Sequence, residues 1–384
     1  MAIVGVICEY NPFHKGHQKQ FDLIRQEYGE ETAIVCLMSG NYVQRGSPAL
    51  FDRQIRTRAA LNCGADLVLE LPVTGSLSSA EGFARAGVSI LSGLCDRLCF
   101  GSETADPEAL TQCAEALLRP QFPEQLRLAL AAGISFPAAR VKALEAMGLS
   151  GVPLEKPNDI LGVEYCKAIL ELGSSLKPYP ILRQGSYHDC CPDPENPSAT
   201  SLRALAEQNR DYFSYIPAPA AECFRSAPVH TLHSGERAIL YRLRTMADED
   251  FEALPYGSEG LWRRFMKACR QEGSLEDILT RATTKRYPTA RVRRMLWAAF
   301  LNLEPPSAEV PYIRVLAATE AGRKLLRQMQ DSGVPVLTKA ADVGRLGPAA
   351  EALFTQEARR TDVYTLAASP LPCGSDWRKT PVMV

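Results

Sequence analysis

Residues 2–28 read AIVGVICEYNPFHKGHQKQFDLIRQEY, and this stretch decides the fold of the chain. Its first seven residues are apolar or small, which predicts a buried β-strand. A loop follows, and the spacing of apolar residues from His17 to Tyr28 predicts a helix. Between the two stands His-Lys-Gly-His, which holds two of the chain's five histidines. A strand, a loop and a helix in this order form the first unit of an α/β sheet.

The same alternation continues through the first half of the chain. Further strand-like segments are residues 32–40, 65–72, 96–103 and 177–185. Helix-like segments are residues 51–64, 79–93, 107–118, 123–133, 137–148, 159–172 and 201–210. This rhythm predicts a Rossmann-like, mainly parallel sheet with helices on both faces. Ligands bind such sheets at the carboxyl ends of the strands, where the loops after Cys8, Met38, Leu71 and Phe100 emerge.

After about Pro217 the pattern changes, and helical periodicity dominates. Residues 230–246 and 259–271 are both amphipathic at helical spacing. We therefore expect an α/β domain over residues 1–216 and a mainly α-helical domain over residues 217–384.

Composition narrows the class of protein. The chain has 384 residues, 46% of them hydrophobic and 23% charged, and a net charge of -1. No apolar run approaches the ~20 residues of a membrane span, and no leader-like segment opens the chain, so we expect a cytoplasmic protein without a membrane partner. Because the net charge is close to zero, the chain has no overall positive electrostatic potential that would attract DNA. Twelve scattered cysteines without CxxC spacing predict reduced thiols and no metal site.

The His-x-Gly-His motif has a specific physical use after a strand. A helix N-terminus presents unpaired amides and the positive end of the helix dipole, which favours a phosphate group. His14 and His17 can donate hydrogen bonds to phosphate oxygens and stabilise charge as an α-phosphate is attacked. Gly16 lets a ligand approach the backbone closely. The alternative is a chance match, because the motif fixes only three letters.

A second motif, PSATSLR, stands near the end of the α/β region and contains Ser198, Thr200 and Arg203. Nucleotidyltransferases with the HIGH-type signature carry a late S-S/A-T-x-x-R motif that holds the β- and γ-phosphates. A hydroxyl at a helix start is also an ordinary N-cap. The two motifs in this order, with a nucleotide-fold pattern between them, favour an ATP site.

Six separated segments carry a closer resemblance: CEYNPFHKGH, GNYVQRGSPALFD, GADLVLELP, CFGSE, PNDILGVEY and SATSLR. In this order they resemble the bacterial tRNA(Met) cytidine acetate ligase family, and SEGLWRRFMKA, TTKRYPTARVRRML and YIRVLA extend the similarity. The resemblance implies a nucleotidyltransferase-like fold. It also implies that acetate attacks ATP to give acetyl-adenylate and pyrophosphate. The acetyl group then passes to the wobble cytidine of elongator tRNA(Met), giving N4-acetylcytidine.

The resemblance also implies which residues bind ATP. It places Gly101, Asn158 and Arg183 in the ATP site, where Gly101 would admit adenine or ribose, the Asn158 amide would read a base edge and Arg183 would hold a phosphate or carboxylate. Asn158 as a helix N-cap and Gly101 as a turn residue are the alternatives. The N-terminal part of the site would comprise Ile7, Cys8, Glu9, Tyr10, Asn11, Pro12, Phe13, His14, Lys15, Gly16, His17 and Gln20.

Other polar residues fall outside these two motifs. Gln44 and Arg45 follow the second strand and face the same crevice, where Arg45 either neutralises an acetate carboxylate or a phosphate, or is an exposed loop cation. His188 is interpreted as a loop residue, not as a third catalytic histidine. The pattern gives Cys190 and Cys191 no role.

The densest positive cluster lies in ATTKRYPTARVRRML and consists of Lys285, Arg286, Arg291, Arg293 and Arg294. Phosphate contacts from such a patch supply most sequence-independent affinity for RNA. An ordinary solvated helix face is the alternative. With the resemblance, we expect this cluster to bind tRNA.

The expected ligands are ATP, with Mg²⁺ arriving on it, and acetate. Two other functions stay open from the residues. One is a nucleotidyltransferase that adenylylates a small phosphate-containing substrate without RNA. The other is a non-catalytic ATP- or RNA-binding module whose histidines only grip phosphate.

Overall fold

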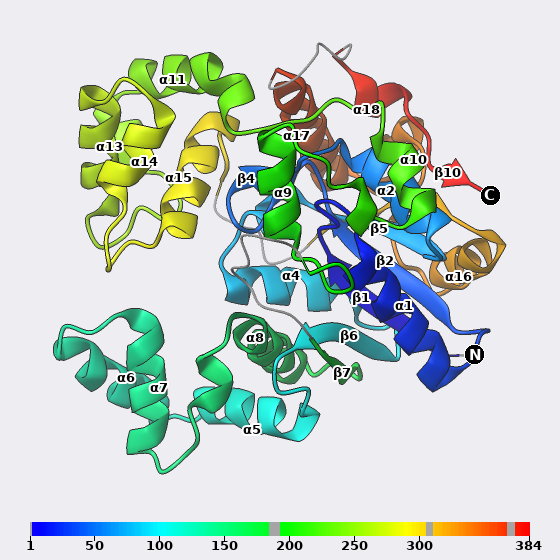
Figure 1. Ribbon diagram of the computed structural model, residues 1–384, viewed down its shortest axis with the longest axis horizontal. Coiled ribbons are helices and arrows are strands. Elements are labelled where there is room, and N and C mark those ends of the chain that lie inside the picture. The colour runs from blue at the N-terminus through cyan, green and yellow to red at the C-terminus, as the bar shows by residue number, and fades with distance from the viewer. Residues whose placement is uncertain (1, 184–192, 305–309, 367–372) are drawn as a thin grey trace.

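The computed structural model describes residues 2–183, 193–304, 310–366 and 373–384. His188, Cys190 and Cys191 lie outside these ranges. In the described residues a central sheet has the strand order β10-β8-β5-β2-β1-β6-β7, with β9 paired to β8 (Figure 1). The predicted α/β class with a mostly parallel sheet is confirmed.

Five parallel strands form the core of this sheet, and all are segments that the sequence predicts. They are β1 (Ile3–Cys8), β2 (Ala33–Ser39), β5 (Leu67–Leu71), β6 (Arg97–Ser102) and β7 (Lys177–Leu182). From β1 the chain first adds β2 and β5 on one side, and then β6 and β7 on the other. The strand order therefore reverses at β1, and a crevice opens beside the end of this strand.

Strands from the end of the chain complete the sheet. β8 (Ile313–Ala318) pairs with β5 in antiparallel orientation, and β9 (Val336–Leu337) and β10 (Val382–Met383) pair with β8. The predicted domain boundary after residue 216 stays a prediction. The region beyond it, however, is not only helical, because its last part returns to the sheet that the first part begins.

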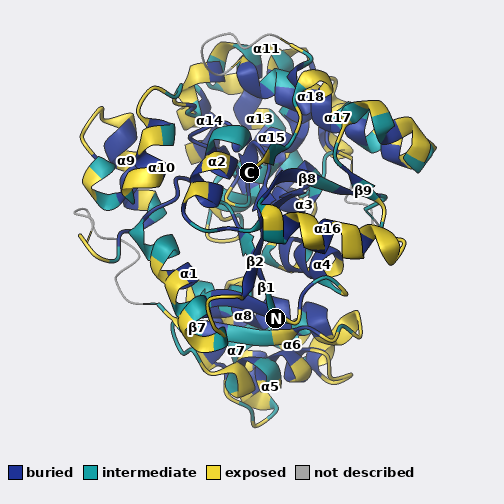
Figure 2. Ribbon diagram, turned by 90° about the vertical axis from the view of Figure 1, so that its right-hand side faces the viewer, coloured by how far each residue is buried: buried dark blue, intermediate teal, exposed yellow. Residues whose placement is uncertain are grey.

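Helices cover both faces of the sheet. Successive β2 residues alternate between two cores, with Val35 and Leu37 in one and Ile34 and Cys36 in the other. The first core includes α4 (Ala80–Leu91), α5 (Pro107–Leu117), α8 (Pro157–Glu171) and α16 (Glu320–Asp331). The second includes α1 (Lys15–Tyr28), α2 (Arg53–Asn62), α9 (Ala199–Glu207) and α10 (Ala218–Phe224). Figure 2 shows β1 and β2 as buried strands inside these layers.

A third core lies in a helical region to one side of the sheet (Figure 1). Its helices are α11 (Glu236–Thr245), α12 (Asp248–Glu252), α13 (Leu261–Gln271), α14 (Leu275–Ala282) and α15 (Thr289–Leu301). Tyr42, which comes from the first part of the chain, is buried in this core with Phe265 and Trp297. The helical region thus packs directly on the α/β region.

The remaining elements lie around the sheet. A hairpin of helices, α6 (Phe122–Ala131) and α7 (Phe136–Ala146), projects beyond α5 (Figure 1). The others are β3 (Tyr42–Val43), β4 (Ser47–Pro48), α3 (Val73–Ser76), α17 (Pro348–Thr365) and α18 (Ser375–Arg378). Across the described ranges, no helix has both the length and the apolar character that crossing a membrane requires.

A buried ion-pair network ties the end of the chain to the sheet. Arg53 pairs with Glu70 at 2.5 Å and with Asp376, and Arg314 pairs with Asp376 at 3.0 Å. These side chains come from α2, β5, α18 and β8. Removing one member would leave an uncompensated buried charge, which is strongly destabilising.

Candidate active site

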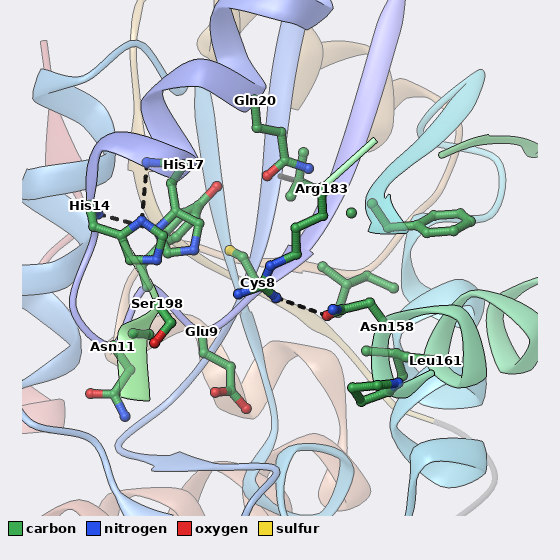
Figure 3. Close-up of a pocket in the computed structure, with 18 of the residues that line it drawn as sticks. Cys8, Glu9, Asn11, His14, His17, Gln20, Asn158, Leu161, Arg183 and Ser198 are labelled. Carbon is green, nitrogen blue, oxygen red and sulfur yellow. Dashed lines mark hydrogen bonds between the residues drawn. The ribbon is translucent and has the colours of Figure 1, made fainter. Parts of the chain in front are cut away.

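A cavity of about 510 Å³ lies at the crevice where the strand order reverses. The ends of β1, β6 and β7 form its floor, and the starts of α1, α8 and α9 point towards it (Figure 3). The predicted residues that line it are Ile7, Cys8, Glu9, Tyr10, Asn11, His14, Gly16, His17, Gln20, Gln44, Arg45, Gly101, Asn158, Arg183, Ser198, Thr200 and Arg203. Segments far apart in sequence therefore meet at one site.

Three predicted residues lie behind or beside the cavity wall. Phe13 is fully buried and packs its ring against Tyr10 at 4.8 Å and against His17 at 5.4 Å. Pro12 precedes it in the same buried loop, and Lys15 forms a loose ion pair with Glu195 at 3.9 Å. Phe13 thus supports a histidine without lining the cavity.

The two histidines cap α1 and fix each other. The Nδ1 atom of His14 accepts from the backbone N–H of Gly16 at 3.1 Å, and Nδ1 of His17 accepts from the backbone N–H of His14 at 3.2 Å. Their rings stack with centroids 3.7 Å apart (Figure 3). A Cβ on Gly16 would lie 3.0 Å from the His14 ring, so a side chain there would crowd the cap.

This geometry sets the protonation state of both rings. Burial lowers the pKa of His17 to about 3, with the Arg183 charge as a smaller cause. Burial also lowers the pKa of His14 well below its usual value. The charges of His17, Arg183 and Arg203 lower it further, as smaller causes. Both rings are therefore neutral near pH 7. Because each Nδ1 accepts a backbone N–H, the proton of each ring is on Nε2. The site thus presents neutral N–H donors.

A buried arginine that the sequence analysis missed holds the cavity loops together. Arg56 is fully buried and donates to the backbone carbonyls of Glu9 at 2.6 Å, Phe51 at 2.9 Å and Ser39 at 3.1 Å. It therefore joins the loops that follow β1 and β2. In the sequence it is one of several arginines in a helical pattern, and no motif distinguishes it as a residue that supports the cavity.

Asn158 is not the N-cap of its helix, which was the alternative to a role in the ATP site. The helix α8 begins at Pro157 with Lys156 as N-cap, so Asn158 is not the cap. Its Nδ2 donates to Glu103 at 2.7 Å, and its Oδ1 accepts from Nη1 of Arg183 at 3.0 Å (Figure 3). Both ends of the amide thus have protein partners, and the Asn158 side chain orients Arg183 at the cavity wall.

Gly101 leaves an open surface on the cavity floor. A Cβ there would meet only the Arg183 side chain, at 3.9 Å, which is ordinary van der Waals contact. The neighbouring protein atoms therefore do not require a glycine. The cavity therefore has open space beside the Gly101 backbone, which a ligand could approach closely.

The PSATSLR motif closes the opposite side. Ser198 is the N-cap of α9, and its Oγ accepts from the backbone N–H of Ser201 at 3.1 Å. Arg203 donates to the carbonyl of Asn11 at 2.8 Å and to Thr200 at 3.1 Å. Ser198 thus has the ordinary capping role and also lines the cavity. The N-terminus of α9 gives the cavity a second positive end.

The five basic residues predicted for tRNA do not form one uniform surface. Lys285 and Arg286 are exposed in the loop before α15. Arg291 is held by Ser258 and Glu259, at 2.8 and 3.1 Å. Arg293 and Arg294 are partly buried, and Arg294 donates to the carbonyl of Gln44 at 3.2 Å.

The chain matches known proteins over its whole length. A family model described as HIGH Nucleotidyl Transferase matches residues 1–375. The tRNA(Met) cytidine acetate ligase of Clostridium novyi is 32% identical, over 100% of this chain and 99% of the relative. That of Thermoanaerobacter sp. is 35% identical, over 96% of both chains. The chain belongs to the tRNA(Met) cytidine acetate ligase family.

Solved structures of this family have the same fold. Thermotoga maritima TmcAL bound with alpha-thio ATP superposes with a TM-score of 0.90 at 29% identity, covering 100% of both chains. The apo form of that protein gives 0.91 at 30% identity. The family resemblance expected from the sequence motifs is confirmed.

Proposed function

We propose that this protein is an ATP-dependent ligase that activates acetate as acetyl-adenylate and transfers the acetyl group to the wobble cytidine of elongator tRNA(Met). The observation that carries the proposal is the pair of neutral histidines at the start of α1, within the cavity beside β1. The names of relatives at 32–35% identity support the same reaction.

The first step uses the histidines as donors. As the acetate oxygen attacks the α-phosphate, negative charge grows on the phosphoryl oxygens and on the leaving pyrophosphate. The Nε2–H groups of His14 and His17 donate to these oxygens, and neutral donors do so without gaining or losing a proton. The α1 N-terminus adds its positive dipole end.

The remaining cavity residues bind different parts of the nucleotide. Thr200 in the first turn of α9 and Arg203 one turn further along hold the β- and γ-phosphates. Gly101 leaves room for the adenosine, and Arg183 contributes its charge close to His17. In the second step the exocyclic amine of cytidine attacks the acetyl carbonyl and forms the new C–N bond. The bond between the carbonyl carbon and the phosphate oxygen breaks, AMP leaves with that electron pair, and the amine releases one proton to solvent.

Mg²⁺ would arrive with ATP. The described residues contain no group of three or more His, Cys, Asp or Glu side chains that could hold a metal ion. Glu9 is the one carboxylate among the described cavity-lining residues. Glu9 would offer its carboxylate to the ion, and the ion would offset negative charge on the phosphates.

One experiment separates this proposal from its rivals. Purified protein is incubated with ATP and labelled pyrophosphate, with and without acetate and in the absence of RNA. We expect exchange of label into ATP only when acetate is present. Exchange with a small phosphate ester in place of acetate would favour the RNA-independent nucleotidyltransferase. ATP binding without any turnover would favour a non-catalytic module. Acetylation of tRNA(Met) is then measured with labelled acetate.

A further inference from the structure

A short turn connects the cavity with the helical region. Residues 44–46, here called the 44–46 turn, join β3 to β4. Gln44 and Arg45 line the cavity, with Arg45 exposed at its mouth. The backbone N–H of Gln44 donates to Oε1 of Glu9 at 2.8 Å. The turn is therefore anchored to the cavity loop on one side.

Helix α15 anchors the other side of the turn. The indole Nε1 of Trp297 donates to the carbonyl of Gly46 at 3.0 Å, and the bond is buried. Nη1 of Arg294 donates to the carbonyl of Gln44 at 3.2 Å. The Trp297 ring also contacts Tyr42, with centroids 5.0 Å apart. The first and last carbonyls of the turn are thus both bound by one helix.

Gly46 fits this helix closely. Its φ of +74° is left-handed, and an added Cβ would lie 2.6 Å from Cβ of Arg293 and 2.8 Å from the backbone N of Arg294. The obstructing atoms are backbone or adjacent to it, so they have little freedom to move. A side chain at residue 46 would push the turn away from α15.

The hairpin has little support of its own. β3 and β4 are two residues each and pair only with each other, outside the main sheet. An isolated two-stranded hairpin is marginally stable. The position of the 44–46 turn therefore depends on Glu9 and on α15.

We propose that α15 is a structural part of the acetate-activating site, with Trp297 and Arg294 as positioning residues that hold the 44–46 turn so that Arg45 faces the cavity. Arg45 supplies a positive charge for the incoming carboxylate or for a phosphate. The helical region thus acts in the first half-reaction, when no RNA is bound. This inference rests on the proposed function, because acetate activation is its readout.

The first test compares two glycines. Gly46→Ala is expected to lower kcat/KM for acetate in the pyrophosphate-exchange assay by roughly 10- to 100-fold, because small misplacements of a positioned group are costly. Gly93→Ala is the matched control: Gly93 has a φ of +77°, but an added Cβ there meets nothing within 4 Å. Both variants carry the strain of a left-handed alanine, and only Gly46→Ala meets α15.

The second test asks whether the effect passes through Arg45. Trp297→Phe keeps the packed ring and removes the N–H that binds Gly46. It is combined with Arg45→Ala in a double-mutant cycle, as is Gly46→Ala. If the turn acts by positioning Arg45, Gly46→Ala lowers kcat/KM roughly 10- to 100-fold in the parent and Trp297→Phe lowers it several-fold. In the Arg45→Ala background each change lowers kcat/KM less than about twofold.

The outcomes distinguish a failure of the positioning role of α15 from a failure of the proposed acetate activation. Equal activity of the Gly46→Ala and Gly93→Ala variants would overturn the inference, as would fully additive losses in the cycle, which mark general structural damage. A parent protein without acetate-dependent exchange would instead overturn the proposed function. Thermal denaturation shows whether each variant is folded.

Discussion

Arg183 donates a hydrogen bond from its Nη1 atom to the Oδ1 atom of Asn158 at a distance of 3.0 Å. The Nδ2 atom of the same amide donates to a carboxylate oxygen of Glu103. The amide can therefore not rotate without losing a partner. The amide thereby fixes the orientation of Arg183, whose charge lies close to His17. We therefore expect Asn158 to act on ATP through Arg183.

Replacing Asn158 tests this arrangement. Asn158→Ala leaves Arg183 without this acceptor, and we expect KM for ATP to rise about tenfold, the equivalent of one charge-assisted hydrogen bond. Glu155→Ala, an exposed change in the turn before α8, is the control. Both are measured by acetate-dependent pyrophosphate exchange. An unchanged KM in the Asn158→Ala variant would contradict the role assigned to the amide.

His17 is expected to act as a neutral donor. His17→Ala should lower turnover by roughly 10²–10³, and His17→Gln, which keeps an N–H group, should recover part of the loss. With a pKa of about 3, His17 does not titrate between pH 6 and 8. The parent kcat/KM for ATP should therefore not fall as the pH rises through 6.5. A fall with this midpoint would indicate a charged imidazolium in the free enzyme.

Gly101 provides a test of ligand contact that leaves the fold intact. Because an added Cβ has room among the protein atoms, Gly101→Ala should unfold at nearly the parent temperature. ATP binding, measured by calorimetry, should weaken by roughly tenfold or more if adenosine lies against the bare backbone. Parent-like affinity would show that the nucleotide lies elsewhere in the cavity.

The exposed basic residues before α15 offer the cleanest test of RNA binding. Reversing both Lys285 and Arg286 to Glu should weaken tRNA binding and make its salt dependence shallower, by up to roughly one slope unit per lost phosphate contact. Acetate activation should stay at the parent rate. The control reverses Arg323 and Arg327, exposed on α16 away from α15 (Figure 1). Equal losses in both variants would indicate only a general charge effect.

His230 connects stability to pH. It is buried and stacks on Tyr364 with centroids 3.9 Å apart, and burial lowers its pKa to about 4. The unfolded chain binds this proton near pH 6.5, so the free energy of unfolding should fall as the pH drops from 6.5 to 4. One histidine contributes up to about 1.4 kcal/mol per pH unit. His230→Phe should make this slope shallower in urea titrations, and an unchanged slope would contradict the assignment.

The sequence predicted the elements with strong periodicity. The five parallel strands and the helix after His-x-Gly-His follow from apolar runs and spacing, and the two motifs meet at one cavity. The β3–β4 hairpin was not predicted, because two-residue strands carry no alternating pattern. Arg56 and Glu103 were also missed as functional candidates. Their roles depend on carbonyls and amides that only the folded chain brings near them.

The antiparallel pairing of β8 with β5 was likewise beyond the local pattern. The segment YIRVLA carries part of the family resemblance, but its place in the sheet depends on a partner far back in the sequence. Such long-range pairing is decided by packing, which periodicity does not encode.

That pairing has a consequence for how the protein is made. A nascent chain that has completed β5 still carries an apolar, unpaired strand edge at Leu67–Leu71, and β8 emerges from the ribosome only after the whole helical region. Unpaired edges of this kind recruit other chains. A fragment ending at residue 216 should therefore aggregate, although it contains all the described residues that line the cavity. The growing chain should need shielding by chaperones until its last strands arrive.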